Sequence, residues 1–358
     1  MNERRVSDLV IVGVDIGYGF TKATDGKKTV IFPSVGGDVV QADFDNELIK
    51  AGRGQVLTVD QTRWFYGWHA QKHSRNPLAL FARERTEQVD LMLVLFRAAM
   101  AELGVANSRS LTNSAGSTNS ASSPNSNRIA LCTGLPVDWY DDKPELERLL
   151  MGEHVFTVGA GAAARQQCVH VCRVFVVPQP FGSFFEQVLD AEGALINAEF
   201  ARSKVGVLDV GTYTTDYALS DGLEYVAKSS GSKTVAMSTV WRAVRDGIKA
   251  QWGIEYDLHQ IDHLMRNGRT VTVHGVPRSV DALIEPAVEN LAGHVLAGAR
   301  ERWGTARDFA RILLTGGGAE YVKTQVQAVY PHAQVLNAPH LGNLRGFFKY
   351  ARRKVAHV

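Results

Sequence analysis

The feature that most constrains this chain of 358 residues is a strand-and-turn pattern that occurs twice. The segments Val12-Gly-Val-Asp15-Ile-Gly17 and Val205-Gly-Val-Leu-Asp209-Val-Gly211 each place an Asp-x-Gly turn after an apolar run. Such β-branched runs are typical of buried strands, and a second strand follows each turn. The two aspartates lie 194 residues apart (209 − 15), which is about one domain length. We therefore predict an α/β protein with two related domains that face one another.

The chemistry of the two turns predicts that they hold the phosphates of a nucleotide. A tight glycine turn lets backbone N–H groups approach phosphate oxygens without interference from a Cβ atom. Asp15 and Asp209 can hold a hydrated Mg²⁺ ion, because this cation prefers carboxylate and water oxygens. Either turn alone would also fit an ordinary β-turn with a solvated aspartate, so the hypothesis rests on the two together. The predicted phosphate-binding residues are Gly17, Tyr18, Gly19, Lys22, Gly211, Thr212 and Asp216. For Asp216 the alternative, that it only stabilises the second hairpin, stays open.

A third glycine turn follows the apolar segment at 311–315. There Gly316, Gly317 and Gly318 connect a predicted strand to a helix that starts at Ala319 and carries Glu320. The backbone of such a turn can come close to a flat base or a ribose. We therefore predict that these three glycines and Glu320 form the adenosine side of the site.

These three turns, in this order, resemble those of the superfamily that contains actin, heat-shock chaperones and sugar kinases. The segments GVDIGYGFTK, FPS, TGLPV and VVPQPFGSFFE resemble the ParM/StbA plasmid-segregation proteins and their archaeal relatives within it. The resemblance implies an actin-like (ribonuclease H-like) fold in which a nucleotide binds between two α/β domains. It also implies connecting segments at 177–184 and 343–348, with Gln179 positioning the attacking water. In this mechanism Asp15, Asp209 and Gln179 are the predicted catalytic residues, and the two aspartates hold the Mg²⁺ through water.

The same resemblance predicts how the chain is divided. Residues 1–178 and 340–358 would form the first domain, with a small β-rich insert at about 36–80, and residues 179–339 the second. The Ser/Asn/Thr-rich stretch at 107–127 is poor in apolar residues, so we predict a disordered insertion there. Helical periodicity predicts further helices at 85–103, 143–150, 234–252 and 280–303.

Function follows from the resemblance as an expectation. It implies an ATPase that assembles head to tail into filaments with ATP and Mg²⁺ and disassembles after hydrolysis, in plasmid or DNA segregation or a related cytoskeletal role. GTP stays open as the nucleotide, and a DNA-binding adaptor protein would connect the filament to its cargo. The alternatives are a sugar or metabolite kinase and a chaperone-type ATP switch. The kinase would need a further catalytic carboxylate, and the chaperone a β-rich region after residue 358, so the length of the chain favours the filament.

The composition limits which binding partners and which cellular compartment we expect. The net charge is +2 and the basic residues are spread along the chain, which gives no reason to expect direct binding to nucleic acid. Three cysteines in a chain of this size favour a reducing compartment over a disulfide framework. No segment is typical of a signal peptide or a membrane span, so we expect a cytoplasmic protein without membrane contact. Cys168, His170 and Cys172 alternate on a predicted strand, but a structural zinc site needs four ligands, so we expect no metal there.

Overall fold

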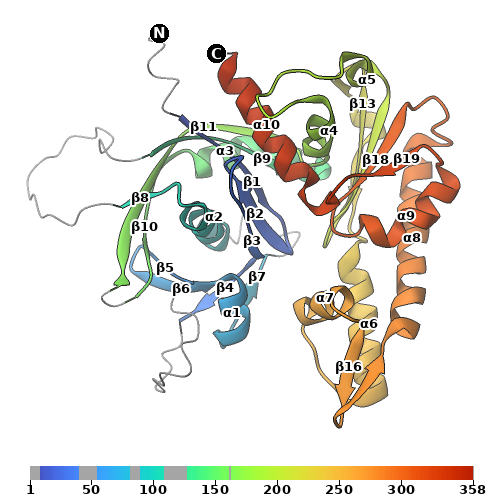
Figure 1. The fold of residues 1–358 in the computed structure, drawn as a ribbon, viewed down its shortest axis with the longest axis horizontal. Helices are drawn as coiled ribbons and strands as arrows, with labels where there is room; N and C mark the ends of the chain where they lie inside the picture. Colours follow the sequence, from blue (N-terminus) through green and yellow to red (C-terminus); the bar gives the residue numbers. More distant parts are fainter. Residues whose placement is uncertain (1–8, 40–54, 81–88, 109–126, 161–162, 358) are drawn as a thin grey trace, which may run out of the picture.

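The computed structural model describes residues 9–39, 55–80, 89–108, 127–160 and 163–357, and these form two halves, each built on its own sheet (Figure 1). The first half contains an eleven-stranded sheet with the order β3-β2-β1-β9-β11-β10-β5-β6-β4-β7, and β8 pairs with β11. Its strands are β1 (Leu9–Ile16), β2 (Phe20–Thr24), β3 (Thr29–Pro33), β4 (Val35–Asp38), β5 (Val56–Val59), β6 (Thr62–Tyr66), β7 (Leu78–Ala79), β8 (Asn107–Ser108), β9 (Asn127–Leu135), β10 (Gly152–Val158) and β11 (Arg165–Pro178).

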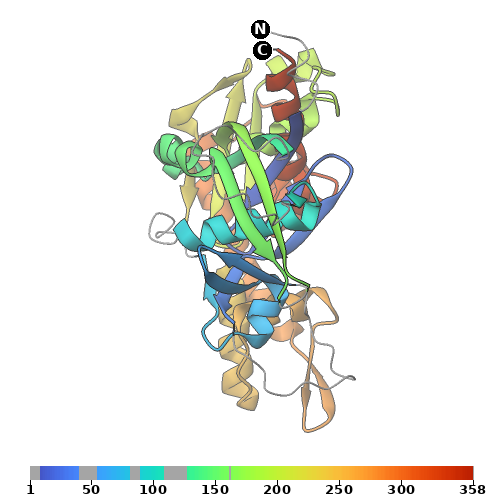
Figure 2. The ribbon, with the colours of Figure 1, turned by 90° about the vertical axis from the view of Figure 1, so that its left-hand side faces the viewer.

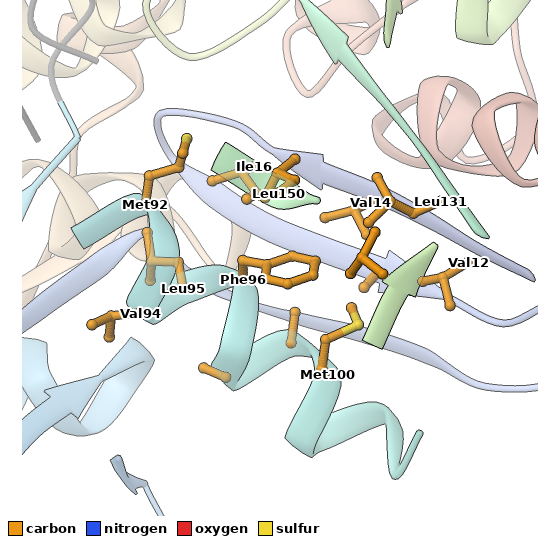
Figure 3. Close-up of a cluster of buried hydrophobic side chains, with 14 of the residues drawn as sticks. Val12, Val14, Ile16, Met92, Val94, Leu95, Phe96, Met100, Leu131 and Leu150 are labelled. Atoms are coloured by element: carbon orange, nitrogen blue, oxygen red, sulfur yellow. The ribbon is translucent and has the colours of Figure 1, made fainter. Parts of the chain in front are cut away.

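The large sheet curls around helix α2 (Val89–Leu103), which lies in its hollow (Figure 1). Val12 and Val14 of β1 meet Phe96 and Met100 of this helix in the main apolar cluster (Figure 3). All four side chains are fully buried, and burying an apolar side chain of this size contributes about 1.5–3 kcal/mol. The strand that leads to the first glycine turn is therefore held by the core of the first half.

The second half has a six-stranded sheet with the order β14-β13-β12-β18-β19, and β15 pairs with β13. Its helices α6, α8 and α9 pack against one another and against the sheet. These elements are β12 (Val205–Val210), β13 (Thr215–Asp221), β14 (Glu224–Tyr225), β15 (Gly231–Lys233), β18 (Arg311–Thr315), β19 (Ala333–Val335), α6 (Met237–Trp252), α8 (Asp281–Trp303) and α9 (Ala319–Val329).

A separate two-stranded hairpin, β16 (Thr270–Val273) and β17 (Val276–Ser279), follows helix α7 (Leu258–Arg266). It lies at one end of the elongated molecule, and the last turn of helix α10 (Gly342–Ala356) lies at the opposite end (Figure 2). The remaining helices are α1 (Gly67–His73), α3 (Lys143–Leu150), α4 (Pro180–Val188) and α5 (Ala198–Arg202).

The end of the chain returns to the first half. Helix α10 packs on α4, β1 and β9, and Phe347 is buried against Cys132 and Val177. The apolar face of this basic helix is thus covered within the molecule. No helix in the described part of the chain has both the length and the apolar character needed to cross a membrane.

Several local predictions match the structure. The strands at 205–210 and 311–315 and the helix at 143–150 have the predicted bounds. The β-rich region at about 36–80 contains β4, β5, β6 and β7, all of which join the large sheet, and its description as an insert stays a prediction. Of the predicted disordered insertion, residues 107–108 and 127 are strand residues, and 109–126 lie outside the described residues. The division of the chain at residues 178 and 339 stays a prediction.

Candidate functional site

The two Asp-x-Gly turns face one another across a cleft of about 350 Å³ between the halves. They are built alike. The N–H group of Gly17 donates to the carbonyl of Phe20 at 3.1 Å, and that of Gly211 donates to the carbonyl of Thr214 at 2.9 Å. In each hairpin the aspartate pairs with the residue seven positions later, Lys22 for Asp15 and Asp216 for Asp209. The repeat seen in the sequence is therefore a repeat of structure.

The tips of the two turns touch. A Cβ atom added to Gly19 would lie 2.3 Å from the hydroxyl oxygen of Thr212, so only glycine fits at this position. Beside them the rings of Tyr18 and Tyr213 meet edge to face, with their centroids 5.9 Å apart. The first turn thus reaches the second turn directly, and the two close one side of the cleft.

Asp15 and Asp209 are both buried in the cleft, but their surroundings differ. Asp15 forms an ion pair with Lys22 at 2.8 Å and accepts a hydrogen bond from the Gln179 amide at 3.2 Å. Asp209 accepts a 2.6 Å hydrogen bond from the amide of Asn343. Burial raises the pKa of Asp209 to about 7, and the neighbouring charge of Asp216 adds to this shift, whereas the Asn343 hydrogen bond opposes it.

This donor set fits a hydrated divalent cation. Two buried carboxylates converge on one cleft from the two halves, and the pKa of Asp209 indicates that its negative charge lacks full compensation. A cation placed near Asp209 would supply that compensation, because an opposite charge favours the ionised form. In the described residues, those of the cleft included, no group of three or more His, Cys, Asp or Glu side chains is arranged to hold a metal ion, so the cation would depend on the two aspartates and on water.

Gln179 lies at the junction of β11 and α4. Its N–H group donates to the carbonyl of Leu135 at 2.7 Å, and Pro180 starts the helix directly after it. Its side chain lines the cleft next to Asp15. The backbone of Gln179 is therefore held by its hydrogen bond to Leu135 and by the helix that starts at Pro180. Its side-chain amide, which is predicted to position water, points at the Asp15 carboxylate.

The third glycine turn contributes two of its three glycines to the cleft. Gly316 and Gly317 line it, and Gly316 has a φ of +87° with no room for a Cβ, which would lie 2.3 Å from Asp209 Oδ1. Gly318 instead packs against Val210 and Met237 in the core. Glu320 lies outside the main cleft, in an adjoining hollow that shares Gly316 and Gly317 with it.

The remaining predicted residues also line the cleft, including Tyr18, Lys22, Gly211, Thr212 and Asp216. Sequence reasoning missed Asn343 as a partner of Asp209, and it missed the side chains that α7 and the residue after it supply, namely Asp262, His263, Arg266 and Asn267. A signal for this helix was present, because Asp257 and Gln260 form a capping box at its start.

Contacts at the cleft mouth connect α7 to the first half. The ring of Phe20 lies 6.1 Å from that of Trp68 and 6.0 Å from that of His259, measured between centroids. The Gln71 amide donates to the Asp257 carboxylate at 3.2 Å. The cleft is therefore bridged at its mouth as well as at the two turns.

Two α/β halves that hold a cleft between repeated glycine hairpins, with the end of the chain packed back on the first half, define the class of actin-fold proteins. The family model described as the N-terminal domain of actin like proteins matches residues 13–182, and that described as archaeal actin homologue MreB-like, C-terminal, matches residues 207–328. The two models cover most of the chain between them, and the chain has the fold of the actin-like proteins.

Individual relatives agree with this assignment. An archaeal actin homolog of Thermoplasma acidophilum is 23% identical, with 97% of this chain and 100% of the relative covered. The crystal structure of an archaeal actin homolog in complex with ADP has a TM-score of 0.74 at 20% identity, and covers 96% of this chain and 100% of the other. A 15-stranded ParM filament from Clostridium botulinum has a TM-score of 0.74 at 18% identity, with 97% and 99% covered. The predicted actin-like fold is confirmed.

Proposed function

We propose that this actin-like protein binds a nucleoside triphosphate with Mg²⁺ in the cleft, hydrolyses it, and assembles head to tail into filaments in the cytoplasm. One observation carries the proposal: two glycine hairpins, one from each half, meet tip to tip with a buried aspartate at the base of each. The N–H groups of these turns suit phosphate oxygens. A ligand that contacts both hairpins binds the closed cleft better than an open one, so it shifts the population toward the closed form.

Within this site each residue has a proposed role. Asp15 and Asp209 hold the hydrated Mg²⁺, which when bound neutralises phosphate charge. Lys22, paired with Asp15 in this structure, turns to the phosphates when they are present. Gln179 orients the attacking water, since phosphoryl transfer depends mainly on positioning and charge stabilisation. Gly316 and Gly317 face the nucleoside, and Glu320 lies further out, beside it.

Filament assembly and cargo belong to the same proposal. The ParM filament among the structural neighbours supports self-association, and a head-to-tail contact that does not close into a ring gives a filament. We propose DNA segregation through a DNA-binding adaptor protein as its role, with ATP as the nucleotide and GTP as the alternative. Basic residues spread along the chain make the adaptor more fitting than direct binding to DNA.

The test is light scattering and pelleting of the full chain over a concentration series, together with phosphate release. The nucleotide conditions are Mg²⁺ with ATP, GTP, ADP or none. We expect assembly above a critical concentration only with a triphosphate, and phosphate release that rises with polymer. Asp209→Ala should abolish both, whereas Asp308→Asn, at an exposed ion pair with Lys204 remote from the cleft, should change neither. Phosphate release that is linear in protein without polymer would contradict the filament and favour a non-polymerising enzyme of the same fold.

A further inference from the structure

Asp216 lies where the second phosphate turn meets the first half. In β13 it is paired with Asp209 on one side and with Ser232 of β15 on the other. Its side chain is buried, with 2% of the residue exposed. It therefore connects the aspartate at the base of the turn to a strand that borders the other half of the molecule.

Both oxygens of the Asp216 carboxylate already have donors within the protein. Oδ1 accepts from the N–H group of Val137 at 3.2 Å and from the Ser232 hydroxyl, and Oδ2 accepts from the Thr214 hydroxyl at 2.9 Å. Val137 belongs to the first half, where it starts the 3-10 helix η2 (Val137–Asp142) after β9. A carboxylate that is satisfied in this way holds protein elements together and has little capacity left for a ligand.

Ser232 and Asp138 add a reciprocal pair between the halves. The N–H group of Asp138 donates to the Ser232 hydroxyl oxygen at 3.3 Å, and the N–H group of Ser232 donates to Asp138 Oδ1 at 3.0 Å. The Ser232 hydroxyl thus accepts from one half while it donates to Asp216 of its own half. We call Val137, Asp138, Asp216 and Ser232 the junction.

The junction is continuous with the nucleotide turn. Thr214 donates to Asp216 through its hydroxyl and accepts from the N–H group of Gly211 through its carbonyl. Thr214 also lines the cleft, as Gly211 does. Any ligand that orders this turn therefore acts on Thr214, which is hydrogen-bonded to Asp216 of the junction.

We propose that Asp216 and Ser232 are positioning residues that bind the second phosphate turn to the first half and keep the cleft closed around the nucleotide. This inference rests on the proposed function, because it concerns the nucleotide of the same cleft. It assigns to Asp216 a role between the halves in place of direct contact with the nucleotide. Loss of the junction lets the halves separate, so bound nucleotide leaves faster.

The experiment is stopped-flow dissociation of a fluorescent N-methylanthraniloyl-ADP with Mg²⁺ from the full chain, held below its critical concentration. Ser232→Ala removes the hydroxyl that connects Asp138 to Asp216, and hydrogen bonds that involve a charged group are among the stronger ones. We expect its dissociation rate to rise at least tenfold. Ser232→Thr retains a hydroxyl and should stay within about twofold of the wild type. Asp138→Ala, at an exposed position, should raise the rate without affecting folding.

Ser230→Ala is the matched control. The Ser230 hydroxyl accepts from the Leu219 N–H group and donates to the Val226 carbonyl, so its bonds stay within the second half. An equal rise in rate for Ser230→Ala and Ser232→Ala would assign the effect to local loss of structure and overturn the proposal. A wild-type rate in Ser232→Ala and Asp138→Ala would overturn it while the proposed function stands. If the wild-type chain binds no nucleotide, both the proposed function and the role of the junction are contradicted.

Discussion

The Asp209 carboxyl group is buried between the halves, and its pKa is raised from 3.8 to about 7 by burial first and by Asp216 second. In the unfolded chain this group ionises near its ordinary pKa. Between these two values the folded protein therefore binds the proton more tightly than the unfolded chain does. Stability falls as the pH rises through this range, by at most about 1.4 kcal/mol per pH unit from this group.

The substitution Asp209→Asn, studied in the nucleotide-free protein with EDTA, should remove the part of the pH dependence of stability that comes from the raised pKa of Asp209. At pH 5 the wild-type carboxyl group is neutral in the fold, so both proteins should have similar free energies of unfolding. At pH 8 the wild type must keep a buried charge, and the variant should be more stable by about 1–3 kcal/mol. Urea denaturation at the two pH values measures the difference. Other buried groups, such as Asp262, are common to both proteins, so a difference independent of pH would contradict the raised pKa.

Residues in local motifs could be predicted from the sequence, and residues that meet only through the fold could not. Asp15 and Gly17 stand next to each other in a recognisable pattern, and so do Asp209 and Gly211. Asn343 donates to Asp209 from 134 residues away, and no local pattern in the sequence indicates such a pair. The same limit applies to the contact of Asp138 with Ser232.

At the scale of elements, helices α4 and α10 cross at two glycines. A Cβ atom added to Gly346 would lie 1.6 Å from the carbonyl oxygen of Gly182, and one added to Gly182 would lie 2.5 Å from the carbonyl oxygen of Asn343. The helices are therefore in backbone contact, and Asn343 is held next to Ser183, whose N–H group and hydroxyl both donate to it. This crossing places the Asn343 amide against Asp209.

Gly346→Ala should therefore destabilise the protein, although alanine favours an isolated helix over glycine by about 1 kcal/mol. Separating the two helices should cost about 2–4 kcal/mol, and displacing Asn343 should weaken nucleotide binding as well. Thermal unfolding and nucleotide titration measure the two effects. Arg352→Ala, on the exposed side of the same helix, is the control and should change neither. A Gly346→Ala protein as stable as the wild type would show that the crossing can relax.

Strands that form an apolar run were predicted from the sequence at their observed bounds. Strands β12 and β18 are continuous apolar runs within a sheet that is covered on both faces. Helix α7 has only nine residues, four of them buried, so its apolar pattern is too short to stand out in the sequence. The strands at 56–79 are short, and their place in the large sheet depends on pairing with β10, which lies far along the chain.

At the scale of the whole molecule, its two ends differ in a way that suits a head-to-tail contact. One end carries α5 (Figure 1), and Ile196, two residues before this helix, is 60% exposed. The opposite end carries the β16–β17 hairpin, where Val276 is 47% exposed (Figure 1). These exposed side chains are the positions at which the proposed head-to-tail contact can be tested.

If the proposed head-to-tail contact uses these two ends, Ile196→Asp and Val276→Asp should each raise the critical concentration at least tenfold, because either change places a charge in that contact. Nucleotide affinity below the critical concentration should stay at the wild-type value, since neither residue lines the cleft. A heterologous contact has two different faces, so each variant retains the face that the other has lost. An equal mixture should therefore form dimers through the one intact contact and stop there. Sedimentation velocity of the mixture measures this outcome, and polymer formed by both variants at the wild-type concentration would locate the contact elsewhere.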